Sequence, residues 1–197
     1  MPEFPETSES LILQVRDRED REAWERFEQL YRPVIFRIAK RHGLQHNDAL
    51  DLVQQVLFSV SNAINRYERV ENGPPFRNWL SRITRNAILK ALTRAPRDRA
   101  AGGTEPCGLL DAIPSTNAAT EDLIETEYQR EVYSRAASAV RGDIEETTWL
   151  AFELTMLQSE SIEHVANALG ISTGSVYAAR SRVMRRLRDA VKRIEQP

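Results

Sequence analysis

Cysteine is nearly absent from this chain of 197 residues, whose single thiol is that of Cys107. One cysteine excludes a disulfide framework and a zinc site built from several thiolates. The histidines His42, His46 and His164 bring no third ligand at a recognisable metal-binding spacing. We therefore expect no metal site and no other cofactor.

Long apolar segments are also missing. The chain has no run of about eighteen apolar residues, which a membrane-spanning helix requires. Its first six residues are acidic and interrupted by proline, unlike a secretory signal. These absences predict a cytoplasmic protein without membrane insertion.

Neither positive nor negative charge is in large excess overall, but both are unevenly distributed along the chain. Lys and Arg number 27 and Asp and Glu 29, which gives a net charge of -2. Residues 76–99 carry seven cations against one anion, and residues 171–197 carry seven against two. Between them lies an acidic stretch that contains Glu121, Asp122, Glu125, Glu127, Glu131, Asp143, Glu145 and Glu146. Two basic helices indicate nucleic-acid binding, although two solvated helix faces would show the same charge pattern.

The acidic segment between the two basic ones suggests two roles. It could keep the free protein from binding DNA, because its carboxylates repel phosphates. It could also pack against a basic partner surface.

Apolar residues recur at helical spacing and nowhere alternate as in a strand, so the sequence predicts an all-α fold. Asp20, Asn47 and Asp143 are the predicted N-caps of three of its helices, and Gly43 the stop of the first of them. The predicted helical segments are 11–15, 20–42, 47–64, 76–92, 120–140, 143–156, 161–169 and 173–194.

Composition divides the chain into two small helical domains joined by a linker. Residues 1–9 are rich in Pro, Glu and Ser and are expected to be a disordered tip. Residues 10–94 form the first predicted domain. Residues 95–119 contain scattered Gly, Pro, Ser and Thr and predict the linker, and residues 120–197 form the second domain.

The second domain contains the pattern of a helix-turn-helix over residues 161–188. A short amphipathic helix is followed by a turn at Gly170, an apolar residue at Ile171, a cap at Ser172 and a long basic helix. In a DNA-binding helix-turn-helix the second helix enters the major groove. The residues predicted to face DNA are Ser175, Tyr177, Ala178, Arg180, Ser181, Arg182 and Arg185.

Two motifs of the first domain carry a more specific resemblance. Residues 48–58, DALDLVQQVLF, and residues 76–87, FRNWLSRITRNA, closely resemble region 2 of the extracytoplasmic-function (ECF) sigma factors of bacterial RNA polymerase. The helix-turn-helix is similar to region 4 of the same family, and both motifs occur in the family's order with a linker between them.

The resemblance implies a polymerase-docking surface and two DNA-reading surfaces. In the family, the helix with the Asp-x-x-Gln pattern docks on the coiled-coil clamp of the largest polymerase subunit, which here points to Asp51, Gln54 and Gln55. The family usually has Glu at the position of Gln55.

The basic helix of region 2 opens the −10 promoter element, and the loop before it, residues 68–75, would form the wall of a base pocket. The residues that this implies are Arg77, Asn78, Arg82, Arg85, Asn86 and Lys90. Phe76, Trp79 and Ile83 are expected in the bundle core. Region 4 reads the −35 element. Its recognition helix normally has an apolar residue where this chain has Arg180, which implies an altered preference or a repositioned phosphate contact.

The function implied is that of a sigma factor with no catalytic chemistry of its own. It would bind core RNA polymerase and promoter DNA, and the resemblance leaves open an anti-sigma factor as a further partner. A stand-alone helix-turn-helix regulator, with the N-terminal bundle as a sensing or dimerisation module, is the alternative. No nucleophile elbow, phosphate loop or cluster of metal ligands supports an enzyme.

Overall fold

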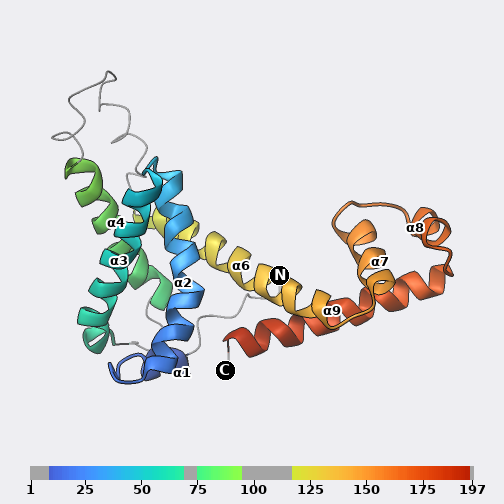
Figure 1. Ribbon diagram of the computed structural model, residues 1–197, viewed down its shortest axis with the longest axis horizontal. Helices are drawn as coiled ribbons and strands as arrows, with labels where there is room; N and C mark the ends of the chain where they lie inside the picture. Colours follow the sequence, from blue (N-terminus) through green and yellow to red (C-terminus); the bar gives the residue numbers. More distant parts are fainter. Residues whose placement is uncertain (1–8, 69–74, 95–116, 196–197) are drawn as a thin grey trace, which may run out of the picture. The chain divides into compact units, whose positions relative to one another are not determined.

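The computed structural model describes residues 9–68, 75–94 and 117–195 (Figure 1), and within these ranges it contains helices and no strand, which confirms the all-α class. The elements are α1 (Glu9–Gln14), α2 (Arg21–Arg41), α3 (His46–Ala63), the short 3-10 helix η1 (Ile64–Arg66), α4 (Phe76–Arg94), α6 (Asn117–Gly142), α7 (Glu146–Met156), α8 (Ile162–Leu169) and α9 (Thr173–Glu195).

The described chain divides into two compact units, and the division lies inside α6, between Glu131 and Val132. The predicted second domain starts earlier, at residue 120. The difference arises because Ile124, Glu127 and Tyr128 are buried among the helices of the first unit, where the Tyr128 ring stacks on Tyr31 with 5.6 Å between centroids.

In unit 1, α2 packs on α3 and α3 packs on α4, and Figure 1 shows α3 beside both. The predicted start and stop of α2 are confirmed: Asp20 Oδ1 accepts the N–H of Ala23 at 3.0 Å, and Gly43 follows the helix with φ 80. The predicted Asn47 cap is wrong. α3 begins at His46, and the residue before it makes no side-chain cap bond.

Aromatic rings fill the core of unit 1. Phe76, at the start of α4, lies 5.9 Å from both Phe27 and Tyr31 of α2 between ring centroids. Its side chain is buried, as predicted, while Trp79 and Ile83 are only partly buried. This packing fixes the start of α4 against α2.

In unit 2, the second half of α6 packs with α7, α8 and α9 around two apolar clusters. One contains Trp149 and Phe152 of α7 with Leu187 of α9, and the other joins Val165 of α8 to Val176 of α9. The predicted Asp143 cap is wrong, because α7 begins at Glu146 and Glu145 at its N-cap makes no side-chain bond.

Several predictions fall partly or wholly outside the described residues. These are the tip at residues 1–9, of which only Glu9 is described, most of the linker at 95–119, and most of the loop at 68–75. The last residues of the predicted linker, 117–119, belong to α6. Across the described part of the chain, no helix combines the length and apolar character needed to cross a bilayer.

Candidate nucleic-acid and partner interfaces

The exposed face of α3 carries the three residues predicted to dock on the polymerase. Asp51, Gln54 and Gln55 are all exposed, whereas Leu52 and Val53 between them are buried. The apolar stripe of α3 packs inward, so the positions opposite to it must point to solvent. The structure therefore brings the three predicted residues together on one face.

Phe58 lies on the same face of α3 and was not predicted as a site residue. It follows Asp51 by seven positions and Gln54 by four, a spacing that places all three on one side of a helix. Its side chain is 70% exposed. An exposed phenyl ring among polar neighbours is a typical anchor of a protein interface. The helical spacing alone would have identified its outward direction.

The cations of α4 lie on two different faces of this helix. Arg82, Asn86 and Lys90 are exposed, and Arg85 is partly buried. Arg77 instead belongs to the stripe that includes Ser81 and Thr84, and all three are buried. The six residues predicted at the −10 element are thus not all on one accessible surface.

The guanidinium of Arg77 is enclosed by α6. It forms an ion pair with Glu125 and lies 4.3 Å from the ring centroid of Tyr128. Burial acts to lower the pKa of Arg77, but the negative potential of Tyr31 and the hydrogen bond and charge of Glu125 outweigh it and raise that pKa above its ordinary value. Arg77 is therefore a charged group fixed inside unit 1.

Asn78, the next predicted residue, is also held by α6. Its Nδ2 donates a hydrogen bond to Glu121 Oε2 at 3.1 Å. Asn78 and Arg77 are the first polar side chains of α4, so α6 covers the start of the helix predicted to open DNA.

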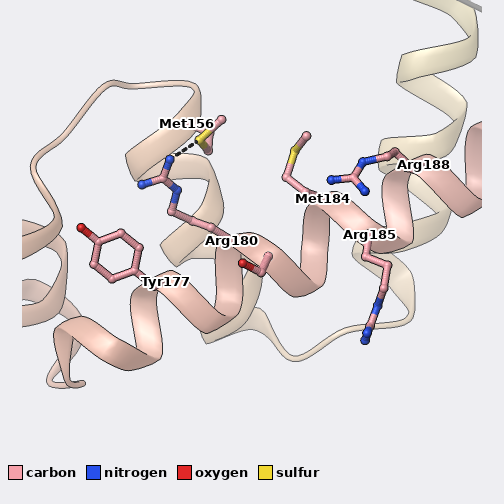
Figure 2. A pocket seen from close by; sticks show the side chains of 7 residues that line it. Met156, Tyr177, Arg180, Met184, Arg185 and Arg188 are labelled. Carbon is pink, nitrogen blue, oxygen red and sulfur yellow. Dashed lines mark hydrogen bonds between the residues drawn. The ribbon is translucent and has the colours of Figure 1, made fainter. Parts of the chain in front are cut away.

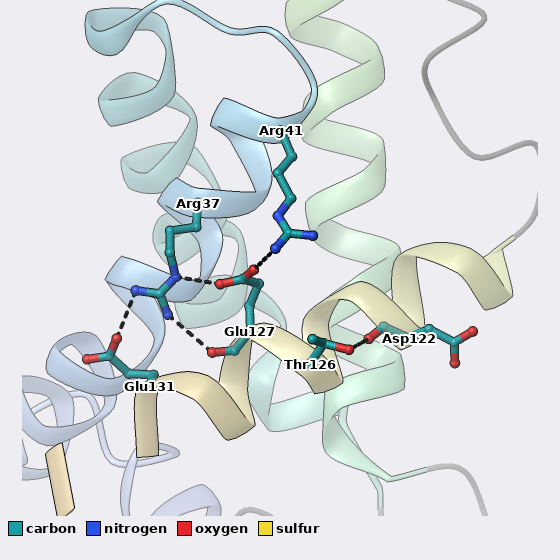
Figure 3. A network of polar contacts seen from close by, with 6 residues as sticks. All are labelled: Arg37, Arg41, Asp122, Thr126, Glu127 and Glu131. Atoms are coloured by element: carbon teal, nitrogen blue, oxygen red, sulfur yellow. Dashed lines mark hydrogen bonds and ion pairs between the residues drawn. The ribbon is translucent and has the colours of Figure 1, made fainter. Parts of the chain in front are cut away.

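A second set of contacts joins α6 to the end of α2 (Figure 3). The Glu127 carboxylate, with no exposed surface, pairs with Arg37 Nε and Arg41 Nη2, each at 2.5 Å. Arg37 also donates through Nη1 to Glu131 Oε2 at 2.9 Å and through Nη2 to the backbone oxygen of Glu127 at 3.1 Å. The first part of the acidic segment, from Glu121 to Glu131, therefore packs on basic residues of its own chain.

In unit 2, the connection between α8 and α9 has the geometry predicted for residues 161–172. Ser161 caps α8 by accepting the N–H of His164 at 3.2 Å. Gly170 ends α8 in the left-handed region, with φ 65, where a residue without Cβ is favoured. Ser172 Oγ accepts the N–H of Ser175 at 3.1 Å and caps α9.

The outward face of α9 carries the predicted DNA-facing residues. Ser175, Tyr177, Ala178, Ser181, Arg182 and Arg185 are exposed, and Arg180 is partly exposed. Opposite to them, Val176, Ala179 and Val183 are buried. All but Arg180 are thus exposed to solvent on α9, and their contact with DNA stays a prediction.

Arg180 differs from its neighbours in where its guanidinium lies. A hollow of about 510 Å³ runs along α9 and is lined by Met156, Tyr177, Arg180, Ser181, Met184, Arg185 and Arg188. Figure 2 shows the Arg180 side chain turned toward the end of α7, where its Nη2 donates to Met156 Sδ at 3.0 Å. Arg180 therefore forms the wall of this hollow.

Arg186, further along α9, has a structural contact. Its Nη1 donates to the backbone oxygen of Asp143 at 2.9 Å, which ties α9 to the connection between α6 and α7. Replacing Arg186 is therefore a matched control for replacing the exposed arginines of the predicted DNA face.

Comparison with known proteins agrees with part of this picture. Residues 27–98 match the family described as Sigma-70 region 2, a range that contains most of α2, all of α3 and all of α4. This confirms the resemblance to region 2 for that segment. The resemblance of α8 and α9 to region 4 stays a prediction.

Similarity to one known protein extends further along the chain. The ECF RNA polymerase sigma factor SigE of Mycolicibacterium smegmatis (strain ATCC 700084 / mc(2)155) is 24% identical over 167 residues, which is 85% of this chain and 61% of that protein. The similarity therefore spans less than two thirds of the length of this relative.

Proposed function

We propose that this chain is a sigma factor of the ECF type, which binds core bacterial RNA polymerase and directs it to particular promoters. The observation that carries the proposal is the segment matched to Sigma-70 region 2, together with the exposed polar face of α3 inside it. In this role the protein supplies binding and positioning, and the polymerase supplies the chemistry. A cytoplasmic location would follow from this partner.

The docking surface in this proposal is Asp51, Gln54, Gln55 and Phe58. Their neighbours on the other side of α3 are buried, so this surface is presented on a rigid helix, and binding costs little ordering of the backbone. Phe58 would contribute most of the apolar area, and the three polar residues would select the partner through hydrogen bonds.

Two surfaces would read the promoter. The exposed side of α4, with Arg82, Asn86 and Lys90, would hold the opened −10 strand, since cations follow a single-stranded backbone and amides bond to base edges. The outward face of α9 would enter the major groove of the −35 element, where arginines bind guanine or phosphate.

Transcription from a library of random DNA templates tests this proposal. Core bacterial polymerase is incubated with the library in the presence or absence of the protein, and the transcribed templates are sequenced. We expect two enriched elements upstream of the start site only when the protein is present. Equal enrichment with and without the protein would refute the role in promoter selection.

A stand-alone DNA-binding regulator would give a different result. It would bind duplex DNA in the absence of polymerase and leave the spectrum of transcripts made by core polymerase without new start sites.

A further inference from the structure

The acidic half of α6, residues 119–131, makes charged contacts with other helices of unit 1 at two separate places. Glu121 and Glu125 accept hydrogen bonds from Asn78 and Arg77 at the start of α4. Six residues after each of them, Glu127 and Glu131 pair with Arg37 and Arg41 at the end of α2. Between the two places, the side chains of Ile124 and Tyr128 are buried. The segment is thus held against other helices of unit 1 at both places and at the buried side chains between them.

We infer that the acidic half of α6 is an intramolecular latch that covers part of the DNA-binding surface of α4 and is released when the protein engages a promoter. This inference rests on the proposed function. Its direct support is chemical. The donors of Arg77 and Asn78, for which the resemblance to region 2 implies a role at the −10 strand, are satisfied by carboxylates. Carboxylates accept the same hydrogen bonds as phosphate oxygens. DNA and the acidic half of α6 therefore compete for the same groups.

The course of the chain gives a second reason. α6 passes from unit 1 into unit 2 at Glu131 and Val132 without a break, so no free residues separate the units while the acidic half is bound. Elements named for positions −10 and −35 are about 25 base pairs apart, which is roughly 85 Å at about 3.4 Å per base pair. Release of the latch would add residues 117–131 to the chain segment that connects the two DNA-reading units, and so lengthen that segment.

The contacts are suited to reversible release. Two of the ion pairs each have one buried and one accessible partner: Glu127 and Arg77 are buried, whereas Arg41 is 51% and Glu125 36% exposed at their side chains. Water and salt therefore reach one side of each pair and weaken it. The buried Ile124 and Tyr128 hold the segment in place when no partner is present. We expect the latch to be closed in the free protein and opened by the combined contacts of polymerase and DNA.

Charge-neutral variants of the latch test the inference. In Glu121→Gln/Glu125→Gln, both side chains keep their shape but lose the charges that hold Asn78 and Arg77. The matched control is Asp122→Asn/Glu145→Gln, which removes two charges from exposed residues. Figure 3 shows the Asp122 carboxylate pointing away from Arg37 and Arg41. Thermal unfolding of each full-length variant shows that it remains folded.

The first readout is binding of a fluorescein-labelled single-stranded DNA of mixed sequence, measured by anisotropy. Both variants lose two negative charges, so the net charge of the protein rises by the same amount in both. We expect the latch variant to bind at least about fivefold more tightly than the control at low salt, with the difference shrinking as salt rises. Equal affinities of the two variants would overturn the inference.

The second readout is hydrogen–deuterium exchange of the wild-type protein, free and bound to core bacterial polymerase with promoter-library DNA. We expect residues 119–131 to lose protection in the complex while the buried face of α3 keeps it. If the protein joins the polymerase and residues 119–131 stay protected, the latch is refuted and the proposed function stands. If it never joins the polymerase, the proposed function fails, and the DNA-binding comparison of the two variants still decides whether α6 competes with nucleic acid.

Discussion

Replacing Glu127 by Ala should destabilise unit 1 more than any exposed charge change. The carboxylate is fully buried and pairs with Arg37 and Arg41, and removing one partner of a buried ion pair costs about 3–5 kcal/mol. Here the arginine side chains are 29% and 51% exposed, so both can be rehydrated once the carboxylate is gone. We therefore expect a smaller loss, about 2 kcal/mol in the free energy of unfolding. For a chain of this size that corresponds to a Tm lower by about 6 °C.

Circular dichroism during thermal and urea unfolding measures this loss. Glu28→Ala is the control, because Glu28 pairs with Arg32 on the exposed surface of α2, where both side chains are more than 40% exposed. That variant should lose less than about 0.5 kcal/mol. Equal effects of Glu127→Ala and Glu28→Ala would refute the assignment of Glu127 as a buried bridge between α2 and α6.

Three further changes test other parts of the molecule. Phe58→Ala should weaken binding to core polymerase about tenfold or more. It should not lower the Tm, since the ring is 70% exposed in the free protein. Unchanged affinity in a pull-down titration would show that Phe58 is not part of the interface. Gly170→Ala should cost about 1–2 kcal/mol because of the positive φ of 65, and Gly170→Asn should cost less; equal Tm values for both variants and wild type would contradict this reading of the turn. Arg182→Ala should weaken DNA binding and reduce the slope of its salt dependence by about one. Arg186→Ala, which loses the bond to Asp143, should mainly lower the Tm. The reverse pattern would make Arg186 the DNA-binding residue and Arg182 the structural one.

Features that depend on nearby residues could be predicted from the sequence. The Asp20 cap, the stop at Gly43 and the turn at Gly170 are confirmed because each depends on the backbone within a few residues. Helix periodicity also assigned the outward faces of α3 and α9 correctly. The caps at Asn47 and Asp143 are wrong, because these helices begin one residue before and three residues after the predicted caps, where no side chain closes the first turn.

Features that depend on distant residues could not be predicted in the same way. The binding of the acidic half of α6 to unit 1 joins residues about 90 positions apart, such as Arg37 and Glu127, and no local pattern reports such a pairing. Arg77 is an intermediate case. Its place on the buried stripe of α4 follows from helical spacing, but only the structure shows that Glu125 neutralises it there.

Co-elution with core bacterial RNA polymerase in size-exclusion chromatography tests the central claim most directly. Wild-type protein should elute with the polymerase, and Asp51→Ala/Gln54→Ala should lose most of this binding while keeping its Tm. Gln158→Ala/Asp189→Ala removes the same two residue types from exposed positions of unit 2 and should co-elute like wild type. A wild-type protein that stays apart from the polymerase but binds duplex DNA alone would contradict the claim and identify a stand-alone regulator.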